Sequence, residues 1–330
     1  MIPKTWLDSA AARLKPHVSE TPLQYDSELN IFLKWENYQI TGSFKLRGAL
    51  NKVMTLQPWE RDRGLIAASA GNHGQGVAFA GSKLGVPVIV FASEHAASNK
   101  LVAMRRLGAD VRLVPGGYGE AEQAGLNFAH EDQKTWVSPY NDGQVIAGQG
   151  SLGLETLQQL EQSSVIIGNT ITWVVPVGGG GLCSGIACAI YESSQFLSRS
   201  HRLVGVQSEA SPFFHSIYHQ GSQAGQIELP SLADGLAGPV EEGSVTIPIL
   251  RRHLDDLILV SEVEIANAIQ FAWEHYGEII EGAAAASLAA VLSDKVTGRP
   301  AIVIISGGNI SSDLHQNLCG DTKQIRFKGI

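Results

Sequence analysis

The sequence has little cysteine and no excess of basic residues, and each shortage excludes a class of protein. Its 330 residues include three cysteines, Cys183, Cys188 and Cys319, whose spacing suits neither a disulfide framework nor a zinc site. We interpret them as small core residues of a protein in a reducing cytoplasm. The 24 basic and 32 acidic residues give a net charge of −8, which argues against a nucleic-acid binder and against a protein of anionic membranes.

Long apolar runs are also missing. The N-terminus shows no basic segment followed by an apolar stretch, and no later stretch approaches the length that crosses a bilayer. We therefore expect a small-molecule partner, with neither membrane nor nucleic acid involved. A hydrophobic content of 44% with 17% charged residues is typical of a folded protein, and the length allows two hydrophobic cores.

What the sequence does contain is an alternation of short apolar strands and helices. One series has strands at residues 65–70, 88–92, 111–114 and 135–138, and a second has strands at 172–177, 203–207, 257–260 and 301–305. Helices are expected before, between and after these strands, at 5–14, after the turn GNHGQG as far as residue 84, and at 99–107, 120–131, 147–161, 182–191, 262–275 and 282–292. This rhythm predicts an α/β fold with two doubly wound parallel sheets. Residues 220–246 are rich in Gly, Ser and Pro and are expected to be irregular.

The stretch ITGSFKLRGALNKV, residues 40–53, places Lys45 at the start of an amphipathic helix with Ser43 as its N-cap. Four apolar residues recur at helical spacing and predict one buried stripe: Leu46, Ala49, Leu50 and Val53. Burial and the positive end of the helix dipole would both lower the pKa of Lys45. The pattern predicts an amine nucleophile, although a surface lysine behind a helix cap fits the same short motif.

The turn SAGNHGQG, residues 69–76, follows a strand and opens a helix. Its backbone N–H groups, with the side chains of Ser69, Asn72 and His73, could hold a carboxylate. A tight strand-to-helix connection with a capping asparagine explains the pattern equally well.

Two further glycine-rich turns end strands of the second series. VGGGGL, residues 177–182, has four consecutive glycines that let the backbone approach a phosphate closely, yet it matches neither the dinucleotide nor the triphosphate fingerprint. In ISGGN, residues 305–309, the hydroxyl of Ser306 could hydrogen-bond a ring nitrogen, or the turn could be an ordinary strand end.

The motifs SFKLRGA, SAGNHGQG, VGGGGL and SGGN, in this order, resemble those of the serine/threonine dehydratase family. These are fold-type II pyridoxal phosphate enzymes, similar to the tryptophan synthase β-subunit, and the resemblance extends over nearly the whole chain. It implies pyridoxal 5'-phosphate as cofactor, a larger cofactor-binding domain of residues 1–63 and 141–330, and a smaller mobile domain of residues 64–140. Only a short tail follows Asn309, as in forms that lack a regulatory domain.

The resemblance also implies a role for individual residues. Lys45 would be the Schiff-base lysine, Phe44 would pack on the cofactor ring, Asn72 would contact its phenolic oxygen, Ser306 its pyridine nitrogen, and Gly235 would lie near its plane. The phosphate would be held by Gly178, Gly179, Gly180, Gly181 and Leu182. The substrate carboxylate would be held by the loop of Ser69, Ala70, Gly71, Asn72 and His73.

The implied reaction converts L-threonine or L-serine into 2-oxobutanoate or pyruvate and ammonia, with Lys45 removing the α-proton before water is lost. Leu46 precedes Arg47, where sulfhydrylases and threonine synthases usually carry aspartate, and this favours a dehydratase. Ala70 stands where serine racemases carry a second serine, so weak racemisation is expected. A racemase, a β-replacement synthase, another hydroxy-amino-acid lyase and a catalytically idle cofactor-binding relative are the alternatives.

Three expectations concern departures from the family and assembly. Relatives with a divalent cation have acidic ligands after the strand at 203–207, whereas this chain has Gln207 and only Glu209 nearby, so no metal is assigned. Glu281 is followed by Gly282 instead of the usual proline, so its place beside the cofactor is left open. A homodimer is expected from the family alone.

Overall fold

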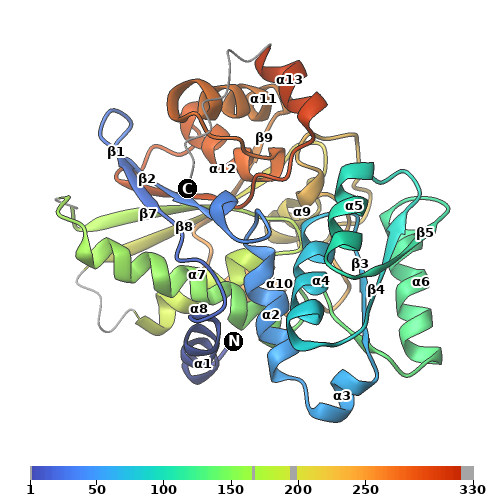
Figure 1. Cartoon of the computed structure of the whole chain (residues 1–330). Helices are drawn as coiled ribbons and strands as arrows, with labels where there is room; N and C mark the ends of the chain where they lie inside the picture. Colours follow the sequence, from blue (N-terminus) through green and yellow to red (C-terminus); the bar gives the residue numbers. More distant parts are fainter. Residues whose placement is uncertain (1, 166–167, 194–198, 321–330) are drawn as a thin grey trace.

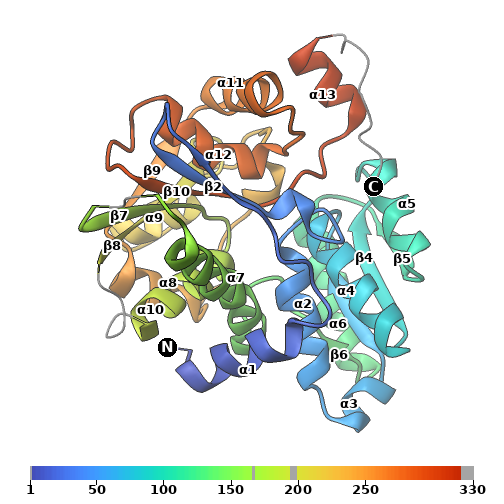
Figure 2. The same ribbon diagram turned by 60° about the vertical axis from the view of Figure 1, so that its left-hand side comes forward.

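The computed structural model describes residues 2–165, 168–193 and 199–320. Two sheets lie side by side and are seen from two directions in Figures 1 and 2. The larger sheet has six strands in the order β1-β2-β10-β7-β8-β9, and the smaller has four in the order β5-β4-β3-β6. The predicted α/β class with two doubly wound sheets is confirmed.

In the larger sheet, five strands run parallel and β1 pairs antiparallel with β2. The sequence did not predict β1, and so the sheet is mixed rather than purely parallel. Its strands are β1 (Leu23–Asp26), β2 (Ile31–Trp35), β7 (Thr170–Pro176), β8 (Ser200–Ser208), β9 (Asp256–Val260) and β10 (Ala301–Ile305).

Helices cover both faces of the larger sheet because successive side chains of a strand point to opposite sides. In β10, Ile302 and Ile304 belong to the core on one face, while Val303 and Ile305 belong to the core on the other. The first core includes residues of α1 (Lys4–Leu14), α7 (Gly143–Gln162), α8 (Gly181–Ser193), α9 (Phe213–Gln220) and α10 (Thr246–His253). The second includes residues of α11 (Glu262–Phe271), the π-helical turn η4 (Ala272–Tyr276) and α12 (Gly282–Leu292).

The smaller sheet is wholly parallel. Its strands are β3 (Leu65–Ala68), β4 (Val88–Ser93), β5 (Asp110–Val114) and β6 (Thr135–Trp136). One face packs on α2 (Lys45–Thr55), α4 (Asn72–Leu84) and α5 (Ser98–Arg106), and the other on α6 (Tyr118–Glu131). The sheet lies inside the range predicted for a smaller domain, and its mobility stays a prediction.

Helix α2 lies between the two sheets in both views. The four residues of its predicted stripe have no exposed surface, and burying such aliphatic side chains stabilises a fold by roughly 1.5 to 3 kcal/mol each for the larger ones. The stripe packs against residues of β3, β4 and α4, so the helix that begins with Lys45 belongs to the core of the smaller sheet. The stripe prediction is therefore confirmed.

Most other predicted elements are confirmed to within a few residues at their ends. The prediction of one helix over residues 262–275 is inaccurate, because α11 ends at Phe271 and a π-helical turn follows it. Residues between α9 and α10 are irregular as expected, apart from the short turn η3 (Asp234–Leu236). Among the described residues, the sequence missed four α-helices: α3 (Pro58–Asp62), α9, α10 and α13 (Ser312–Cys319).

Candidate active site

The loop before α2 pairs with the loop that follows β10. Ser43 and Gly307 form an isolated antiparallel bridge, the Phe44 N–H donates to the Ser306 carbonyl at 3.0 Å, and the Gly308 N–H donates to the Gly42 carbonyl at 2.9 Å. Two segments more than 250 residues apart are thereby held together. This pairing places the start of α2 beside Ser306.

The prediction that Ser43 caps α2 is wrong. The residue before the helix is Phe44, which makes no side-chain cap, and the buried hydroxyl of Ser43 has no hydrogen-bond partner among the described residues. The backbone of Ser43 is committed to the bridge with Gly307, which takes it out of capping position. The long-range pairing of Ser43 with Gly307 therefore prevails over the local preference of serine for the N-cap position.

The amine of Lys45 points into the protein. Its Nζ donates to the Pro139 carbonyl at 2.9 Å and lies 5.5 Å from the centre of the Phe44 ring. Burial lowers the pKa of Lys45 from its ordinary 10.5 to about 8, although the nearby Glu281 carboxyl raises it. The predicted direction of the shift is confirmed, and the surface-lysine alternative is excluded.

The glycine run between β7 and α8 forms a close-packed turn. A side chain at Gly179 would collide with the ring of Tyr140, and Gly180 has a φ of +85°, which only glycine adopts readily. The Thr246 hydroxyl fixes the turn by donating to the Gly179 carbonyl at 2.8 Å. Because α8 begins at Gly181, followed by the buried Leu182, the free N–H groups of its first turn make an anion site at this turn.

Tyr140 and Gly235 connect this turn with the rest of the site. Tyr140 follows Pro139, the acceptor of the Lys45 amine, so the amine and the glycine run share a neighbour. On the other side, the Cα of Leu236 lies 3.1 Å from where a Cβ on Gly178 would be. Gly235 directly precedes Leu236, and its place near the cofactor plane stays a prediction.

The loop from Ser69 to His73 also lies near Lys45, whose charge acts on His73. The Ser69 hydroxyl accepts from the Gly71 N–H at 3.0 Å, and Ala70 is partly buried. Asn72 donates to Glu281 Oε1 at 2.6 Å and accepts from Asn309 Nδ2 at 2.7 Å. The side chain of Asn72 therefore links this loop to the loop after β10 and to the start of α12.

His73 is a buried neutral imidazole. Its Nε2 lies 2.8 Å from the Val137 carbonyl, which can only accept, so Nε2 carries the proton. Burial and the Lys45 charge lower the pKa of His73 to about 3. Its Nδ1 is left as a buried acceptor without a partner among the described residues.

Glu281 is the residue whose position the sequence left open. It precedes α12, is 4% exposed, and has a pKa raised to about 7 by burial and by Asp234, while Lys100 and the hydrogen bond from Asn72 lower it. A Cβ on Gly307 would lie 2.6 Å from Glu281 Oε1, so the carboxyl sits against the loop after β10. The sequence did offer a signal for this position, because Glu281 is an acidic residue directly before the run of small apolar residues that forms α12.

Gln207 is the second-to-last residue of β8. It is fully buried, its Oε1 accepts from the His215 N–H at 2.9 Å, and its Nε2 has no partner among the described residues. Within residues 2–165, 168–193 and 199–320, no group of three or more His, Cys, Asp or Glu side chains is placed to bind a metal. In the same part of the chain, no helix has both the length and the apolar character needed to cross a bilayer.

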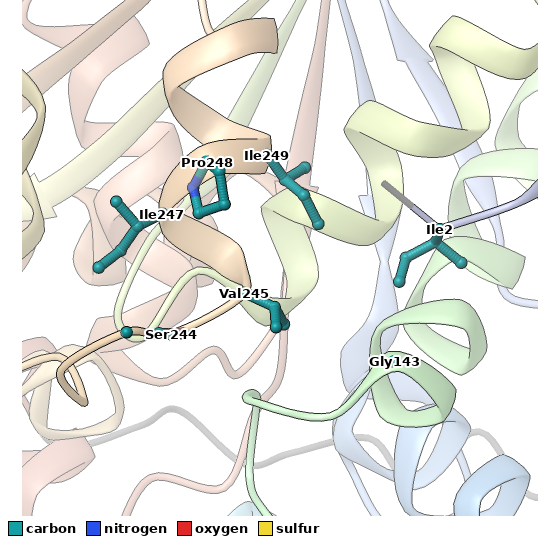
Figure 3. Close-up of a pocket in the computed structure, with 8 residues that line it drawn as sticks. Ile2, Gly143, Ser244, Val245, Ile247, Pro248 and Ile249 are labelled. Carbon is teal, nitrogen blue, oxygen red and sulfur yellow. The ribbon is translucent and has the colours of Figure 1, made fainter.

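A pocket of about 420 Å³ is lined by residues on both sides of Thr246. Figure 3 shows Ile2 and residues at the start of α10 around it, with Gly143 at the start of α7. None of the residues that the sequence predicts to be functional lines it. The pocket is therefore separate from the candidate site.

The residues brought together fit the cofactor that the resemblance implies. Lys45 supplies an amine with a lowered pKa, the turn before α8 supplies N–H groups for a phosphate in a space where a Cβ would collide, and Ser306 supplies a neutral hydroxyl that is 2% exposed. The loop at the start of α4 supplies a second set of N–H groups. Together they can bind an anionic cofactor and an amino acid carboxylate around one base.

Comparison with known proteins agrees with this arrangement. Residues 14–307 match the family described as pyridoxal-phosphate dependent enzymes. The chain is 40% identical over 316 residues to an L-threonine ammonia-lyase of Thermotoga maritima, covering 93% of this chain and 76% of that protein. It is similar to the solved structure of the processed form of threonine deaminase isoform 2 from Solanum lycopersicum, with a TM-score of 0.83, 29% identity and coverage of 96% and 93%. A maize serine racemase also superposes, with a TM-score of 0.83, 28% identity and coverage of 95% of each chain.

Proposed function

The chain belongs to the family of pyridoxal-phosphate dependent enzymes, and from that premise we propose that it is an ammonia-lyase acting on L-threonine, L-serine or both. Its products are 2-oxobutanoate or pyruvate, with ammonia. The observation that carries the proposal is the 40% identity, over nearly the whole chain, to an L-threonine ammonia-lyase, joined to an inward-facing Lys45 amine.

Pyridoxal 5'-phosphate is the cofactor, and when bound it accepts the electron pair that the substrate α-carbon keeps when its proton leaves. Lys45 would hold the cofactor through its amine and, once the substrate amine has displaced it, would take this proton as the base. With a pKa of about 8, roughly a tenth of such amines are neutral at pH 7, compared with far fewer for an ordinary lysine. Lowering the pKa of this amine is thus what burial contributes to the chemistry.

The glycine run and the loop at the start of α4 orient the two anions. The cofactor phosphate is bound at the start of α8 by Gly178, Gly179, Gly180, Gly181 and Leu182. The substrate carboxylate is bound at the start of α4 by Ser69, Ala70, Gly71, Asn72 and His73. Holding both ends of the substrate–cofactor assembly keeps the α-hydrogen directed at Lys45.

Ser306 decides between reaction types. A serine hydroxyl at the pyridine nitrogen offers no negative charge to keep that nitrogen protonated, which limits full carbanion formation. β-Elimination is therefore favoured over transamination. By resemblance to the family, Phe44 would pack on the cofactor ring, Asn72 would contact its phenolic oxygen and Gly235 would lie near its plane.

The activity is tested by incubating the purified holoenzyme with L-threonine and L-serine and measuring 2-oxo acid and ammonia together. Equal release of the two products supports a lyase, and Lys45→Ala should release neither. Cofactor binding without turnover of any 3-hydroxy amino acid would instead identify a catalytically idle relative.

A racemase is the second candidate, because a serine racemase superposes as well as a threonine deaminase does. Ala70 argues against it, since a methyl group cannot return a proton to the opposite face of the α-carbon. Chiral chromatography of unreacted serine after partial turnover separates the two. Formation of D-serine faster than pyruvate would contradict the lyase proposal.

We also propose that the enzyme works as a homodimer in the cytoplasm and that residues 64–140 form a mobile domain. The free cysteines Cys183, Cys188 and Cys319, two of them buried, support a reducing compartment. The homodimer rests on the family resemblance. Light scattering coupled to size exclusion tests the mass, cell fractionation the location, and hydrogen exchange with and without substrate the movement.

A further inference from the structure

One ion pair joins the two sheets at the candidate site. Lys100 in α5 donates to Asp234 Oδ2 in η3 at 2.7 Å. Helix α5 covers the smaller sheet, whereas η3 belongs to the irregular segment that follows β8 of the larger sheet. The pair therefore spans the two halves of the molecule.

Lys100 lies against the loop that holds the substrate carboxylate in the proposed function. Its Cδ and Nζ are 3.8 and 3.9 Å from the position that a Cβ on Gly71 would occupy. Gly71 is the residue that precedes α4, whose first N–H groups point toward an anion at this end. A carboxylate bound by these N–H groups would lie close to the Lys100 ammonium.

Asp234 reaches the same site from the side of the cofactor. It precedes Gly235 and Leu236, and the backbone of Leu236 packs on Gly178 of the glycine run. Both partners also act on Glu281, whose pKa Asp234 raises and Lys100 lowers. The pair thus belongs to the charged surroundings of the reacting centre.

The two partners differ in exposure, and this difference determines which can leave. The side chain of Lys100 is 15% exposed, and that of Asp234 is 61% exposed. Releasing an exposed carboxylate into water costs little, because water replaces its partner. A largely buried ammonium needs an anion, so Lys100 must keep one beside it.

From this asymmetry we propose that Lys100 binds the substrate carboxylate and that Asp234 is its resting counter-ion, released when an amino acid enters. The inference rests on the proposed function only in taking an α-amino acid as the substrate class. Lys100 would then add one positive charge to the neutral N–H groups of the loop from Ser69 to His73.

The competing explanation is that the ion pair is a permanent link between the two sheets. The two explanations predict opposite changes in ligand affinity when Asp234 is replaced. If the pair only links the sheets, removing either partner weakens ligand binding alike. If the counter-ion is exchanged, loss of Lys100 weakens binding of a carboxylate, whereas loss of Asp234 strengthens it by removing a competitor.

The experiment measures dissociation constants of two ligands by calorimetry on the holoenzyme. L-2-Aminobutyrate has the α-carboxylate but no hydroxyl to eliminate, and 1-aminopropane is the same molecule without the carboxylate. Lys100→Met should weaken binding of L-2-aminobutyrate about tenfold and leave binding of 1-aminopropane within about twofold. Asp234→Asn should tighten L-2-aminobutyrate about threefold, and should have no effect on it when Lys100 is already Met.

Lys52→Met is the matched control, because Lys52 pairs with Asp142 at the same 2.7 Å and its side chain is 19% exposed, close to the exposure of Lys100. It should change neither constant. Weakening by Asp234→Asn, equal weakening of both ligands by Lys100→Met, or no wild-type binding of L-2-aminobutyrate would overturn the proposal. Since that ligand is not dehydrated, the result stands apart from any failure of the enzyme to turn over L-threonine.

Discussion

Lys45 and Arg47 are two residues apart on α2 and lie in opposite electrostatic surroundings. The Arg47 guanidinium is 1% exposed and hydrogen-bonds two carboxylates, Glu36 through Nε at 2.9 Å and Glu155 through Nη1 at 2.8 Å. These charges raise the pKa of Arg47 against the opposing effect of burial. The Lys45 amine has a neutral carbonyl as its hydrogen-bond partner instead.

The Arg47 cluster is electrically balanced. It consists of two cations and two anions, Lys34 and Arg47 with Glu36 and Glu155, and Lys34 also donates to Glu155 Oε1 at 2.6 Å and to the Thr21 carbonyl at 2.7 Å. It ties β2, η1 (Glu36–Tyr38), α2 and α7 together. Paired and hydrogen-bonded buried charges hold a structure in one arrangement.

The comparison shows how one helix serves structure and chemistry at once. Arg47 stays permanently charged because two carboxylates hydrogen-bond its guanidinium. Lys45 has no carboxylate as hydrogen-bond partner, so its amine can lose a proton near neutral pH. We therefore expect changes at Lys45 to affect activity more than stability, and changes at Arg47 to do the reverse.

The largest expected effect is on turnover. Lys45→Ala should lower 2-oxo acid release from L-threonine by at least about 10³-fold, because it removes both the attachment point and the base. Far-ultraviolet circular dichroism should remain that of the wild type. A variant retaining more than a tenth of the activity would show that another group acts as base.

Next comes Arg47→Met, which should lower the free energy of unfolding by about 3 to 5 kcal/mol because Glu36 keeps a buried charge without its cation. Urea unfolding measures this. Replacing Lys34, Glu36, Arg47 and Glu155 together with apolar residues of similar size should recover most of the loss. A loss of under about 1 kcal/mol for Arg47→Met alone would mean that the cluster is not balanced by this arginine.

A smaller effect of opposite sign is expected for Lys45→Met in the cofactor-free protein. The pKa of Lys45 falls from 10.5 to about 8 on folding, so the contribution of this group to stability is present above pH 10.5 and is lost as the pH falls through 8. At pH 7 the variant should be more stable than the wild type by about 1 to 2 kcal/mol, allowing for partial exposure. The gain should vanish near pH 10.5, and a constant gain at all pH values would assign it to packing.

The smallest effect concerns Glu281, whose charge raises the pKa of Lys45. In Glu281→Gln the amine should lose its proton at lower pH, by less than about one unit. The rate at which pyridoxal phosphate reconstitutes the cofactor-free protein should follow the neutral amine, with a midpoint near 8 in the wild type. Glu278→Gln, three residues earlier, is the control, and a midpoint that rises in Glu281→Gln contradicts the assigned influence.

Periodicity in the sequence predicted the elements that have a buried face of regular spacing. Helix α2 was found because its apolar stripe recurs at helical spacing, and the strand β10 because it is a short continuous apolar run. The helices α9 and α10 were missed, because they flank a Gly- and Pro-rich segment and are only eight residues long. Strand β1 has no fully buried residue, so alternation could not reveal it.

The candidate site could be predicted only where short motifs mark it. Lys45 and the glycine run stand in recognisable stretches, but the partnership of Asn72, Glu281 and Asn309 joins three distant segments through side-chain hydrogen bonds. The balanced cluster has the same property, since Glu36 and Glu155 meet Arg47 from η1 and α7. Such charge pairing depends on tertiary geometry, which local sequence does not encode.

Close approaches on two sides of α2 restrict how the two sheets could rotate. A Cβ on Gly76 of α4 would lie 3.1 Å from the Lys45 carbonyl oxygen, and one on Gly148 of α7 would lie 2.6 Å from the Arg47 carbonyl oxygen. Any rotation of one sheet against the other that preserves both contacts must have its axis near α2. Displacement in a rotation grows with distance from the axis, so the amine would stay almost stationary while α6, on the far face of the smaller sheet, would move farther.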